Sequence, residues 1–423
     1  MLQLTNIREN KDKVLAGLAK RNKDFSVQID EIIALDDLRK KAQQELDTNL
    51  AEANKLAKEI GDLFKQGKRE EADRLKVRTA TLKESAKGVE ITLNDVEQQL
   101  KQALYLVPNV PYELVVQGKS PEENVEVVNW GENPNLSESK KPHWELAEQY
   151  GLIDFELGVK ITGAGFPVYC GKGARLQRAL INFFLDEAQN AGYKEIIPPL
   201  MVNEESGFGT GQLPDKEGQM YHVGIDNLFL IPTAEVPVTN IYRDTILKED
   251  ELPIKMTAYT PCFRREAGSY GKDVRGLNRL HQFDKVEIVQ IAHPNMSYEI
   301  LETMVEHVKS LLQKLELPYR ILRLCGGDMG FTSAMTYDFE VFSAAQERWL
   351  EVSSTSNFET FQANRLKCRF KGTDGKTQLV HTLNGSALAL PRIVAALLEN
   401  NQTKDGIRIP KALVQYTGFE IVQ

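Results

Sequence analysis

Residues 262–288 read CFRREAGSYGKDVRGLNRLHQFDKVEI, and the fold is inferred most directly from this stretch. Strand-like sequence lies at both ends, in YTPCFRRE and HQFDKVEIV, and the connection between them is too long for a tight hairpin turn. The connection carries Lys272, Arg275 and Arg279 among three glycines. Long loops within compact domains are frequently functional, so this basic, glycine-rich connection is a candidate binding loop.

The side chains of the two expected strands alternate between faces in a way that suits a nucleotide. Because successive side chains of a strand point to opposite faces, Arg264 and Glu266 share one face and Arg265 takes the other. An arginine can bind a phosphate through two parallel hydrogen bonds, and an aromatic ring offers a purine a surface for stacking. The alternative is a set of structural ion pairs on a half-exposed sheet. On the second strand, one face carries Phe283, Lys285 and Glu287 and the opposite face carries Val286 and Ile288. The combination of the Arg-Arg-Glu sequence with the basic loop and with Phe283 favours the nucleotide site.

Two further segments supply groups that would complete such a site. The segment EVSS, Glu351 to Ser354, ends an apolar strand with a carboxylate and two hydroxyls, whose oxygens suit Mg²⁺. In NGSALALPRIVAALLEN, residues 384–400, small residues alternate, and Pro391 then leads into a helix that begins at Arg392. A helix N-terminus and an arginine together favour an anion. The alternative for this segment is a tightly packed junction between a strand and a helix.

Composition narrows the class of protein. The chain has 423 residues, 42% hydrophobic and 26% charged, which indicates a globular protein of two or three domains. No apolar run approaches the roughly 20 residues of a membrane span, and the first residues lack the features of a signal peptide. The four cysteines form no C-x-x-C pair, which argues against a disulfide framework and a zinc site and favours a reducing, cytoplasmic setting. A net charge of −8 gives no global reason to expect nucleic acid.

Residues 28–105 contain no proline and repeat apolar or small residues at helical spacing. This pattern predicts two long helices that pair as an antiparallel coiled coil around a polar turn at residues 65–68. Within residues 55–78, around the turn, eight basic side chains accompany five acidic ones, a balance that suits a phosphate backbone. The alternative is an oligomerisation rod or a scaffold. The expected seam is Ala42, Leu46, Leu50, Ala53, Ala57, Ile60 and Phe64 in the first helix, and Ala72, Leu75, Thr79, Leu82, Ala86, Val89, Leu93, Val96 and Leu100 in the second.

The helical arm is expected to span residues 1–106, and residues 107–423 to form a separate domain. Pro108 and Pro111 end the helical pattern, and residues 107–145 have the character of a linker with little regular structure. Strand-like runs then follow in series with helices mainly at the ends, which predicts an α+β domain on an antiparallel sheet. The expected elements are helices at residues 174–192 and from Arg392 onward, and strands at LFLIPT, MTAYTPCFR, HQFDKVEIVQI, YRILRL and RWLEVSS.

Taken together, these motifs resemble those of a known enzyme family. GYKEIIPPLM (residues 192–201), FRRE with the distal HQFDKVE, and the small-residue strand that ends at Arg392 are similar to motifs 1, 2 and 3 of class II aminoacyl-tRNA synthetases. Within that class the chain resembles the seryl-tRNA synthetases of the bacterial type, nearly from end to end and including the helical arm. The other stretches that carry the resemblance are TGQLP (210–214), PTAEVP (232–237), EVSSTSNF (351–358) and HTLNGSALALPR (381–392).

The resemblance implies a reaction and roles for individual residues. Serine and ATP would give seryl-adenylate and pyrophosphate, and the seryl group would pass to the 3′-terminal adenosine of tRNA(Ser). Arg264 and Arg392 would be the catalytic residues, the first bridging the serine carboxylate and the α-phosphate, the second holding the distal phosphates. The implied ATP site is Arg264, Arg265, Glu266, Phe283, Glu351, Val352, Ser353, Ser354 and Arg392, with Mg²⁺ on Glu351 and Ser354, and the implied serine site is Thr233, Ala234, Glu235, Glu287, Asn384 and Ser386.

The resemblance also implies partners. The arm would bind the long variable arm of tRNA(Ser), whether tRNA(Sec) is a second substrate stays open, and motif 1 would form the interface of a homodimer. No zinc and no membrane are implied. Residues 342–346 depart from the family's usual sequence, so this loop is expected to differ in shape. Two other hypotheses stay in view, a ligase that loads a carrier protein and a non-catalytic binding module, although the presence of Arg264 and Arg392 favours an enzyme.

Overall fold

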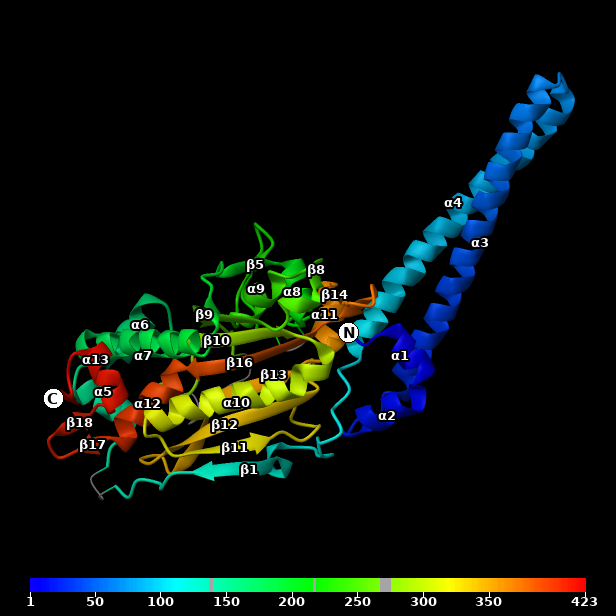
Figure 1. Ribbon diagram of the computed structural model, residues 1–423. Helices are drawn as coiled ribbons and strands as arrows, with labels where there is room; N and C mark the ends of the chain where they lie inside the picture. Colours follow the sequence, from blue (N-terminus) through cyan, green and yellow to red (C-terminus); the bar gives the residue numbers. More distant parts are fainter. Residues whose placement is uncertain (137–139, 216–217, 267–274) are drawn as a thin grey trace. The chain divides into compact units, whose positions relative to one another are not determined.

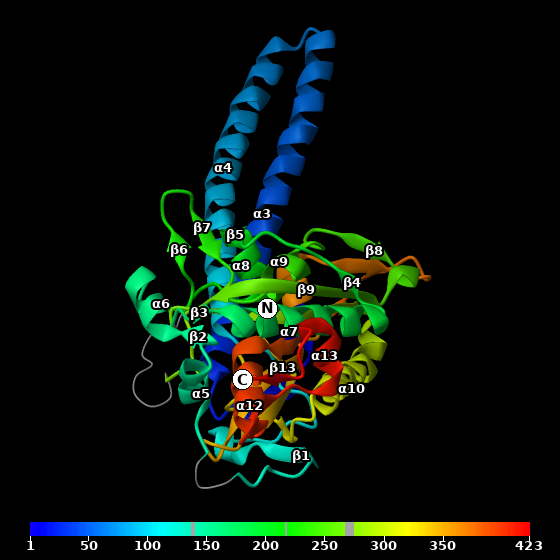
Figure 2. The ribbon, with the colours of Figure 1, turned by 90° about the vertical axis from the view of Figure 1, so that its left-hand side faces the viewer.

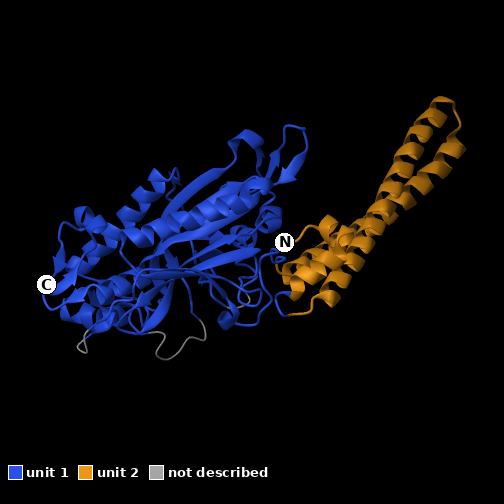
Figure 3. Ribbon diagram, turned by 60° about the horizontal axis from the view of Figure 1, so that its bottom comes forward, with its two compact units in different colours: residues 1, 20–22, 109–423 blue, residues 2–19, 23–108 orange. Residues whose placement is uncertain are grey.

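The protein divides into two compact units, which Figure 3 distinguishes by colour. One unit is helical and contains residues 2–19 and 23–108. The other is built on a large sheet and contains residue 1, residues 20–22 and residues 109–423. In this computed structural model the described residues are 1–136, 140–215, 218–266 and 275–423.

The helical unit consists of two short helices followed by two long ones that fold back on each other (Figure 1). Three residues, Gln66 to Lys68, separate the long helices. The expected pair of long helices and the polar turn between them are confirmed. The helices of this unit are α1 (Leu4–Glu9), α2 (Lys11–Ala19), α3 (Ser26–Lys65) and α4 (Arg69–Leu106).

The seam between the two long helices differs from the expected one in α3 only. The expected residues of α4 are buried or half-buried, whereas Leu50 and Phe64 of α3 are 44% and 40% exposed. Leu56 is buried instead, and Asn49 donates a hydrogen bond to Ser85 Oγ of α4 at 3.3 Å. The expectation was wrong because the polar residue Asn49 occupies one position of the seam. A search for apolar residues alone therefore assigns the neighbouring Leu50 to that position, and later positions are displaced with it. The observed seam of α3 replaces Leu50, Ala57 and Phe64 by Asn49, Leu56 and Leu63.

The second unit is built around an eight-stranded sheet, which confirms the expected α+β architecture. All neighbouring strands are antiparallel except the last pair. The order across the sheet is β1 (Val125–Trp130), β11 (Tyr319–Arg323), β12 (Met335–Ser343), β13 (Arg348–Asn357), β16 (His381–Ala389), β10 (Gln282–Ala292), β9 (Ile254–Phe263) and β4 (Lys194–Glu195).

Helices and small strands surround this sheet. The helices are α5 (His143–Gln149), α6 (Phe155–Ile161), α7 (Gly171–Asn190), α8 (Glu204–Thr210), α9 (Glu235–Asn240), α10 (Ser297–Lys314), α11 (Thr360–Leu366), α12 (Leu390–Asn400) and α13 (Lys411–Thr417). The small strands are β2 (Ile153–Asp154), β3 (Val168–Tyr169), β5 (Met201–Asn203), β6 (His222–Val223), β7 (Leu228–Leu230), β8 (Ile246–Lys248), β14 (Arg369–Lys371), β15 (Thr377–Leu379), β17 (Gln402–Thr403), β18 (Gly406–Arg408) and β19 (Ile421–Val422).

Three helices, α7, α10 and α12, pack on the large sheet through one apolar cluster (Figures 1 and 2). The cluster includes Leu180 of α7, Leu301 of α10 and Leu397 of α12. Phe339 of β12 belongs to the same cluster and is fully buried. Helix α10 lies between β10 and β11 in the chain, so the expectation of helices mainly at the ends of a strand series was wrong. Residues 107–145 also contain strand β1, although they were expected to have little regular structure. The strand lies at the edge of the sheet and most of its side chains are exposed, so its sequence has the polar character of a linker.

Strand β10 explains where a cavity can form on the opposite face of the sheet. Val286 and Ile288 are fully buried in the cluster beneath the helices. Side chains of odd number take the other face, as the alternation predicts. Toward the C-terminal end of β10 that face is apolar, because Val289 and Ile291 pack under α9 and α11. Toward its N-terminal end the same face carries the charged side chains of Lys285 and Glu287 next to the ring of Phe283, and all three line a cavity.

Two glycine-to-alanine substitutions should change stability in opposite directions. At Gly173, in the first turn of α7, an added Cβ would lie 2.1 Å from the carbonyl oxygen of Leu152. Because the backbone must move, Gly173→Ala should destabilise the sheet unit by about 1–3 kcal/mol.

At Gly88 in α4 an added Cβ meets nothing within 4 Å, so Gly88→Ala should stabilise the helical unit by about 1 kcal/mol through helix propensity. Thermal unfolding followed by circular dichroism checks both, and a destabilising Gly88→Ala would contradict the helical geometry.

Candidate active site

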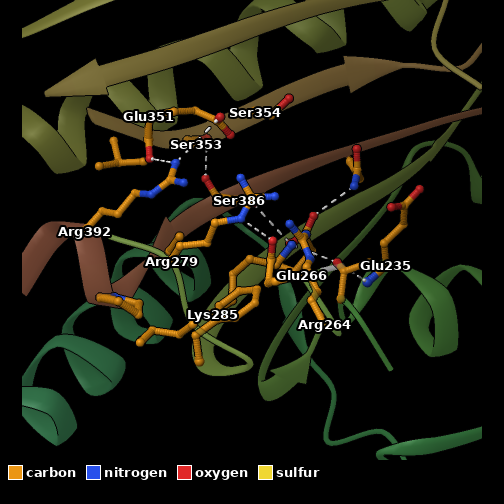
Figure 4. Close-up of a pocket in the computed structure, with 18 of the residues that line it drawn as sticks. Glu235, Arg264, Glu266, Arg279, Lys285, Glu351, Ser353, Ser354, Ser386 and Arg392 are labelled. Carbon is orange, nitrogen blue, oxygen red and sulfur yellow. Dashed lines mark hydrogen bonds and ion pairs between the residues drawn. The ribbon is translucent and has the colours of Figure 1, made fainter. Parts of the chain in front are cut away.

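A cavity of about 430 Å³ lies on the polar part of this sheet face (Figure 4). Two residues of the expected site are absent from its lining: Ala234, which is buried in the apolar cluster around α9, and Arg265, which is exposed. All the others line the cavity together: Thr233, Glu235, Arg264, Glu266, Phe283, Glu287, Glu351, Val352, Ser353, Ser354, Asn384, Ser386 and Arg392.

Arg264 lies just past the end of strand β9, against an aromatic ring. Its guanidinium carbon is 5.2 Å from the centroid of the Phe283 ring, and its Nε donates to the carbonyl oxygen of Pro232 at 3.4 Å. Its backbone N–H donates to the carbonyl oxygen of His281 at 2.9 Å. The guanidinium is thus oriented by stacking and one hydrogen bond, and among the described residues its Nη groups have no hydrogen-bond partner and can bind an anion.

Glu266 reaches the cavity by a different route from the expected one. Strand β9 ends at Phe263, and Glu266 has a positive φ of 49°, so strand alternation does not place its side chain. Its backbone N–H donates a hydrogen bond to Gln219 Oε1 at 3.1 Å, and its carboxylate accepts a hydrogen bond from Arg279 Nε at 2.5 Å. Arg279 was expected only as part of a basic loop, and the structure adds it to the lining of the cavity. Lys272 lies outside the described residues.

Arg392 lies in the first turn of α12. The helix begins at Leu390 and not at Arg392 as expected, because Pro391 fits within its first turn. Its Nη1 donates to the carbonyl oxygen of Glu351 at 2.6 Å, and its Nε donates to the carbonyl oxygen of Asn278 at 3.1 Å. The same Nη1 is 3.7 Å from a carboxylate oxygen of Glu351. Figure 4 shows Arg392 and Arg264 on either side of the cavity, with Arg279 between them. Three guanidinium groups around one polar cavity suit a polyphosphate.

Buried acidic groups line the opposite part of the cavity. Glu287 is 1% exposed. Its carboxylate accepts hydrogen bonds from Asn384 Nδ2 at 2.9 Å and Ser386 Oγ at 3.4 Å, and it forms an ion pair with Lys285 Nζ at 2.6 Å. Lys285 also donates to Thr233 Oγ1 at 2.8 Å. No role was expected for Lys285, although it shares the strand face of Phe283 and Glu287, and that alternation was the signal that could have identified it.

Glu235 is a second buried carboxylate in this part of the cavity. Its Oε1 accepts Gln362 Nε2 at 2.7 Å, and Gln362 is in turn held by Thr382 Oγ1 at 2.7 Å. Burial, together with the negative charge of Glu287, raises the pKa of Glu235 to about 7, although the bond from Gln362 opposes the shift. A carboxylate that is costly to ionise when the cavity is empty is well suited to bind a ligand cation.

The residues expected for Mg²⁺ form a compatible but small donor set. Glu351 and Ser354 both line the cavity (Figure 4). Asp338 faces Ser354 in the register of β12 and β13, and its Oδ1 is buried and makes no hydrogen bond within the described residues. Burial and the neighbouring Glu351 raise the pKa of Asp338 well above its ordinary value. In the described ranges no three His, Cys, Asp or Glu side chains converge on a metal position, so phosphate and water would supply the remaining ligands of Mg²⁺.

Comparison with known proteins accounts for both units. The family model described as "tRNA synthetase class II core domain (G, H, P, S and T)" matches residues 221–401, and "Seryl-tRNA synthetase N-terminal domain" matches residues 1–111. A serine–tRNA ligase of Salinibacter ruber is 50% identical over 99% of this chain and 98% of its own length. The chain belongs to the seryl-tRNA synthetase family.

Other seryl-tRNA synthetases match over the same extent. A serine–tRNA ligase of Akkermansia muciniphila is 48% identical and covers 100% of the chain. The crystal structure of seryl-tRNA synthetase from Pyrococcus horikoshii complexed with ATP superposes with a TM-score of 0.92 at 35% identity and covers 100% of the chain. The family expected from the motifs is thereby confirmed. None of the helices in the described ranges has both the length and the apolarity needed to cross a membrane.

Proposed function

We propose that the protein activates L-serine with ATP to seryl-adenylate and pyrophosphate, and then transfers the seryl group to the 3′-terminal adenosine of tRNA(Ser). One observation carries the proposal: a single cavity combines guanidinium groups at Arg264, Arg279 and Arg392 with buried carboxylates at Glu235 and Glu287. The first set suits ATP, and the second suits the ammonium and hydroxyl groups of serine. The ATP complex of the Pyrococcus horikoshii relative supports ATP as the nucleotide.

The first step needs positioning more than proton transfer. An oxygen of the serine carboxylate attacks the α-phosphorus of ATP, an O–P bond forms, and the bond to the β-phosphate bridging oxygen breaks so that pyrophosphate leaves. Both reacting groups are anionic, so the barrier falls when cations hold them together. Arg264 would contact both reacting groups, and Arg392 would hold the departing phosphates. Mg²⁺ on Glu351 and Ser354 would neutralise phosphate charge when bound.

Adenine and serine would occupy opposite ends of the cavity. Phe283 and Glu266 would hold adenine, by stacking on the ring and by accepting from the exocyclic amine. Thr233 and Glu235 would bind the ammonium group of serine, and Glu287 would accept a hydrogen bond from its hydroxyl group. Lys285 offsets the charge of Glu287 and prevents two uncompensated carboxylates from sharing one buried space.

Serine selection should follow from the polar groups around Glu287. Alanine lacks the hydroxyl and leaves these buried partners unpaired, which costs discrimination factors of about 10⁴. Threonine keeps the hydroxyl and must be excluded sterically. ATP–pyrophosphate exchange without tRNA tests the proposal, with serine, threonine and alanine as substrates. Exchange with serine alone is expected. A folded protein that binds ATP but supports no exchange with any amino acid would leave the binding-module hypothesis ahead.

The raised pKa of Glu235 should appear in the pH dependence of serine binding. Only the carboxylate form attracts the serine ammonium group. Because the pKa is about 7, the fraction of carboxylate falls as the pH drops below that value. The KM for serine should then rise by about tenfold per pH unit below 7 and stay constant above it. Measurement of KM for serine between acidic and mildly alkaline pH checks this, and Glu235→Gln should flatten the profile; a profile unchanged by the substitution would assign the titration to another group.

The partners of the reaction belong to the same proposal. The helical unit would bind the long variable arm of tRNA(Ser) through the basic residues near the turn at Gln66 to Lys68. Charging assays with purified tRNA(Ser) and tRNA(Sec) would decide whether both are substrates. The four cysteines are free thiols, which supports a cytoplasmic setting.

A homodimer is supported by exposed apolar side chains in the motif 1 segment. Ile197 is 88% exposed, Leu200 37% and Met201 47%. Apolar side chains gathered in this way on a monomer surface mark an interface with another chain. Sedimentation or light scattering would show a dimer, and Ile197→Asp should weaken it.

A further inference from the structure

A fully buried histidine–glutamate pair lies outside the lining of the active-site cavity. The side chains of His143 in α5 and Glu399 in α12 are 0% exposed, and His143 Nδ1 is 2.8 Å from Glu399 Oε1. The same oxygen accepts the backbone N–H of His143 at 2.9 Å and Gln346 Nε2 at 2.9 Å, and Ser343 donates to the other carboxylate oxygen. Although burial raises the pKa of Glu399, the bonds from His143 and Ser343 hold it below its ordinary value.

The second ring nitrogen of His143 connects this pair to the loop that follows Glu266. His143 Nε2 accepts the backbone N–H of Leu277 at 2.8 Å. A nitrogen that accepts carries no proton, so the imidazole is neutral and its proton resides on Nδ1, where it is donated to Glu399. The carboxylate thus selects the tautomer that can bind the loop.

Leu277 and the next residue, Asn278, both line the active-site cavity. The carbonyl oxygen of Asn278 accepts Arg392 Nε at 3.1 Å, and Asn278 Nδ2 donates to Gln346 Oε1 at 3.0 Å. Arg392 and Glu399 are seven residues apart in α12, two turns of helix, and therefore lie on the same side of it. One side of α12 thus holds the end of the loop twice, directly through Arg392 and indirectly through Glu399 and His143.

Two further contacts fix the same loop end to α5. The guanidinium carbon of Arg275 lies 4.7 Å from the centroid of the Trp144 ring, next to His143 in the chain. At Gly276 the backbone has a φ of 65°, and a Cβ there would lie 2.3 Å from His143 Nε2. The loop therefore approaches the imidazole so closely that only glycine fits at this position.

We propose that His143 is a positioning residue for ATP, which fixes Leu277 and Asn278 so that the Asn278 carbonyl orients the Arg392 guanidinium toward the phosphates. The proposal rests on the function proposed above. It predicts an effect on ATP and not on serine, because within the described residues the groups that hydrogen-bond to Glu287 make no hydrogen bond to this network. A purely structural role would lower stability without separating the two substrates.

Two substitutions of His143 separate its two hydrogen bonds. In His143→Asn the amide can replace Nδ1 and bind Glu399, but nothing replaces Nε2 as the acceptor for Leu277. In His143→Gln the longer side chain can place its oxygen near the position of Nε2 and keep the bond to Leu277. His143→Asn should lower kcat/KM for ATP by about ten- to hundredfold, since a buried N–H loses its partner and Arg392 loses its support. His143→Gln should stay within about threefold of wild type, given the modest net worth of its remaining bond.

A substitution in the loop itself tests the same contact without changing the buried pair, so its effect cannot come from misfolding of the core. Gly276→Ala leaves α5 and α12 unchanged but forces the loop away from Nε2, so it should raise the KM for ATP as His143→Asn does. Tyr337→Phe is the matched control, because it removes a hydrogen bond to Glu302 Oε1 of α10 at 3.0 Å and Tyr337 does not line the cavity. It should lower the melting temperature and leave the KM for ATP close to that of wild type.

The test measures ATP–pyrophosphate exchange at varied ATP and varied serine, together with ATP affinity by calorimetry. A raised KM for ATP in His143→Asn and Gly276→Ala, with an unchanged KM for serine, supports the proposal. An unchanged KM for ATP in those two variants, or an equal rise in His143→Gln and Tyr337→Phe, overturns it. If the wild type shows no serine-dependent exchange, the proposed function fails, while calorimetry still shows whether His143→Asn weakens ATP binding.

Discussion

Replacement of Arg264 by alanine is expected to lower serine-dependent ATP–pyrophosphate exchange by about 10²–10³-fold, the loss typical of removing one preorganised donor for transition-state charge. Two anions must approach each other in this reaction, and Arg264 is held beside Phe283 with its Nη groups directed into the cavity. Because the guanidinium would bridge both reacting groups, its loss should reduce kcat more than it raises the KM for serine.

Two companion variants make this result specific. Arg264→Lys keeps the charge but loses the planar pair of donors, so it should recover only part of the lost rate. Arg175→Ala is a matched control, since Arg175 in α7 donates to the carbonyl oxygen of Thr417 and does not line the cavity. Its exchange rate should equal that of wild type. Exchange by Arg264→Ala within tenfold of wild type would remove Arg264 from the catalytic role.

Shortening of the helical arm is expected to abolish charging of tRNA(Ser) while leaving serine activation intact. Deletion of residues 50–63 and 71–84 removes matched lengths of α3 and α4, and it keeps both the native turn at Gln66 to Lys68 and the pair Asn49 and Ser85. Lys55, Lys58, Arg74, Lys76 and Arg78 are lost with it. If these side chains contact phosphates, kcat/KM for tRNA should fall by about 10²–10³-fold, because each neutralised phosphate contributes through counterion release.

The measurement compares aminoacylation with pyrophosphate exchange in the same preparation. Circular dichroism should show that the shortened arm is still helical, and exchange should equal that of the full-length protein. The rate of charging by the full-length protein should fall steeply with added salt, and the residual rate of the shortened protein should fall less. Undiminished charging after the deletion would place tRNA recognition outside the arm.

How far the sequence predicts the structure depends on how local each signal is. The strand face with Phe283 and Glu287 follows from alternation along one strand, and the structure confirms it. The seam of α3 did not follow, since the polar Asn49 interrupts the apolar pattern and only the partner helix shows that it belongs there. Helix propensity cannot report a hydrogen bond between two helices, so the register of a coiled coil with a polar residue in its seam has to be read from both helices together.

The site shows the same division. Arg264, Glu266 and Arg392 stand in recognisable motifs, so their presence at one cavity could be expected. Arg279 could not be placed, because its position depends on how the loop returns to the sheet. His143 and Glu399 gave no signal at all: they lie 256 residues apart in the chain, and isolated histidines and glutamates are common on surfaces. Burial and pairing of distant residues are properties of the folded chain.

The hydrogen bond between Asn49 and Ser85 limits how the length of the arm can evolve. Asn49 and Ser85 meet only if the two helices keep one axial alignment. Insertion of one residue in α3 alone would rotate everything beyond it by about 100° and turn charged side chains into the seam. Lengthening that preserves the seam needs a whole heptad in each helix, a step of about 10.5 Å at the usual rise per residue. The length of this arm is therefore expected to change between relatives in discrete steps of that size.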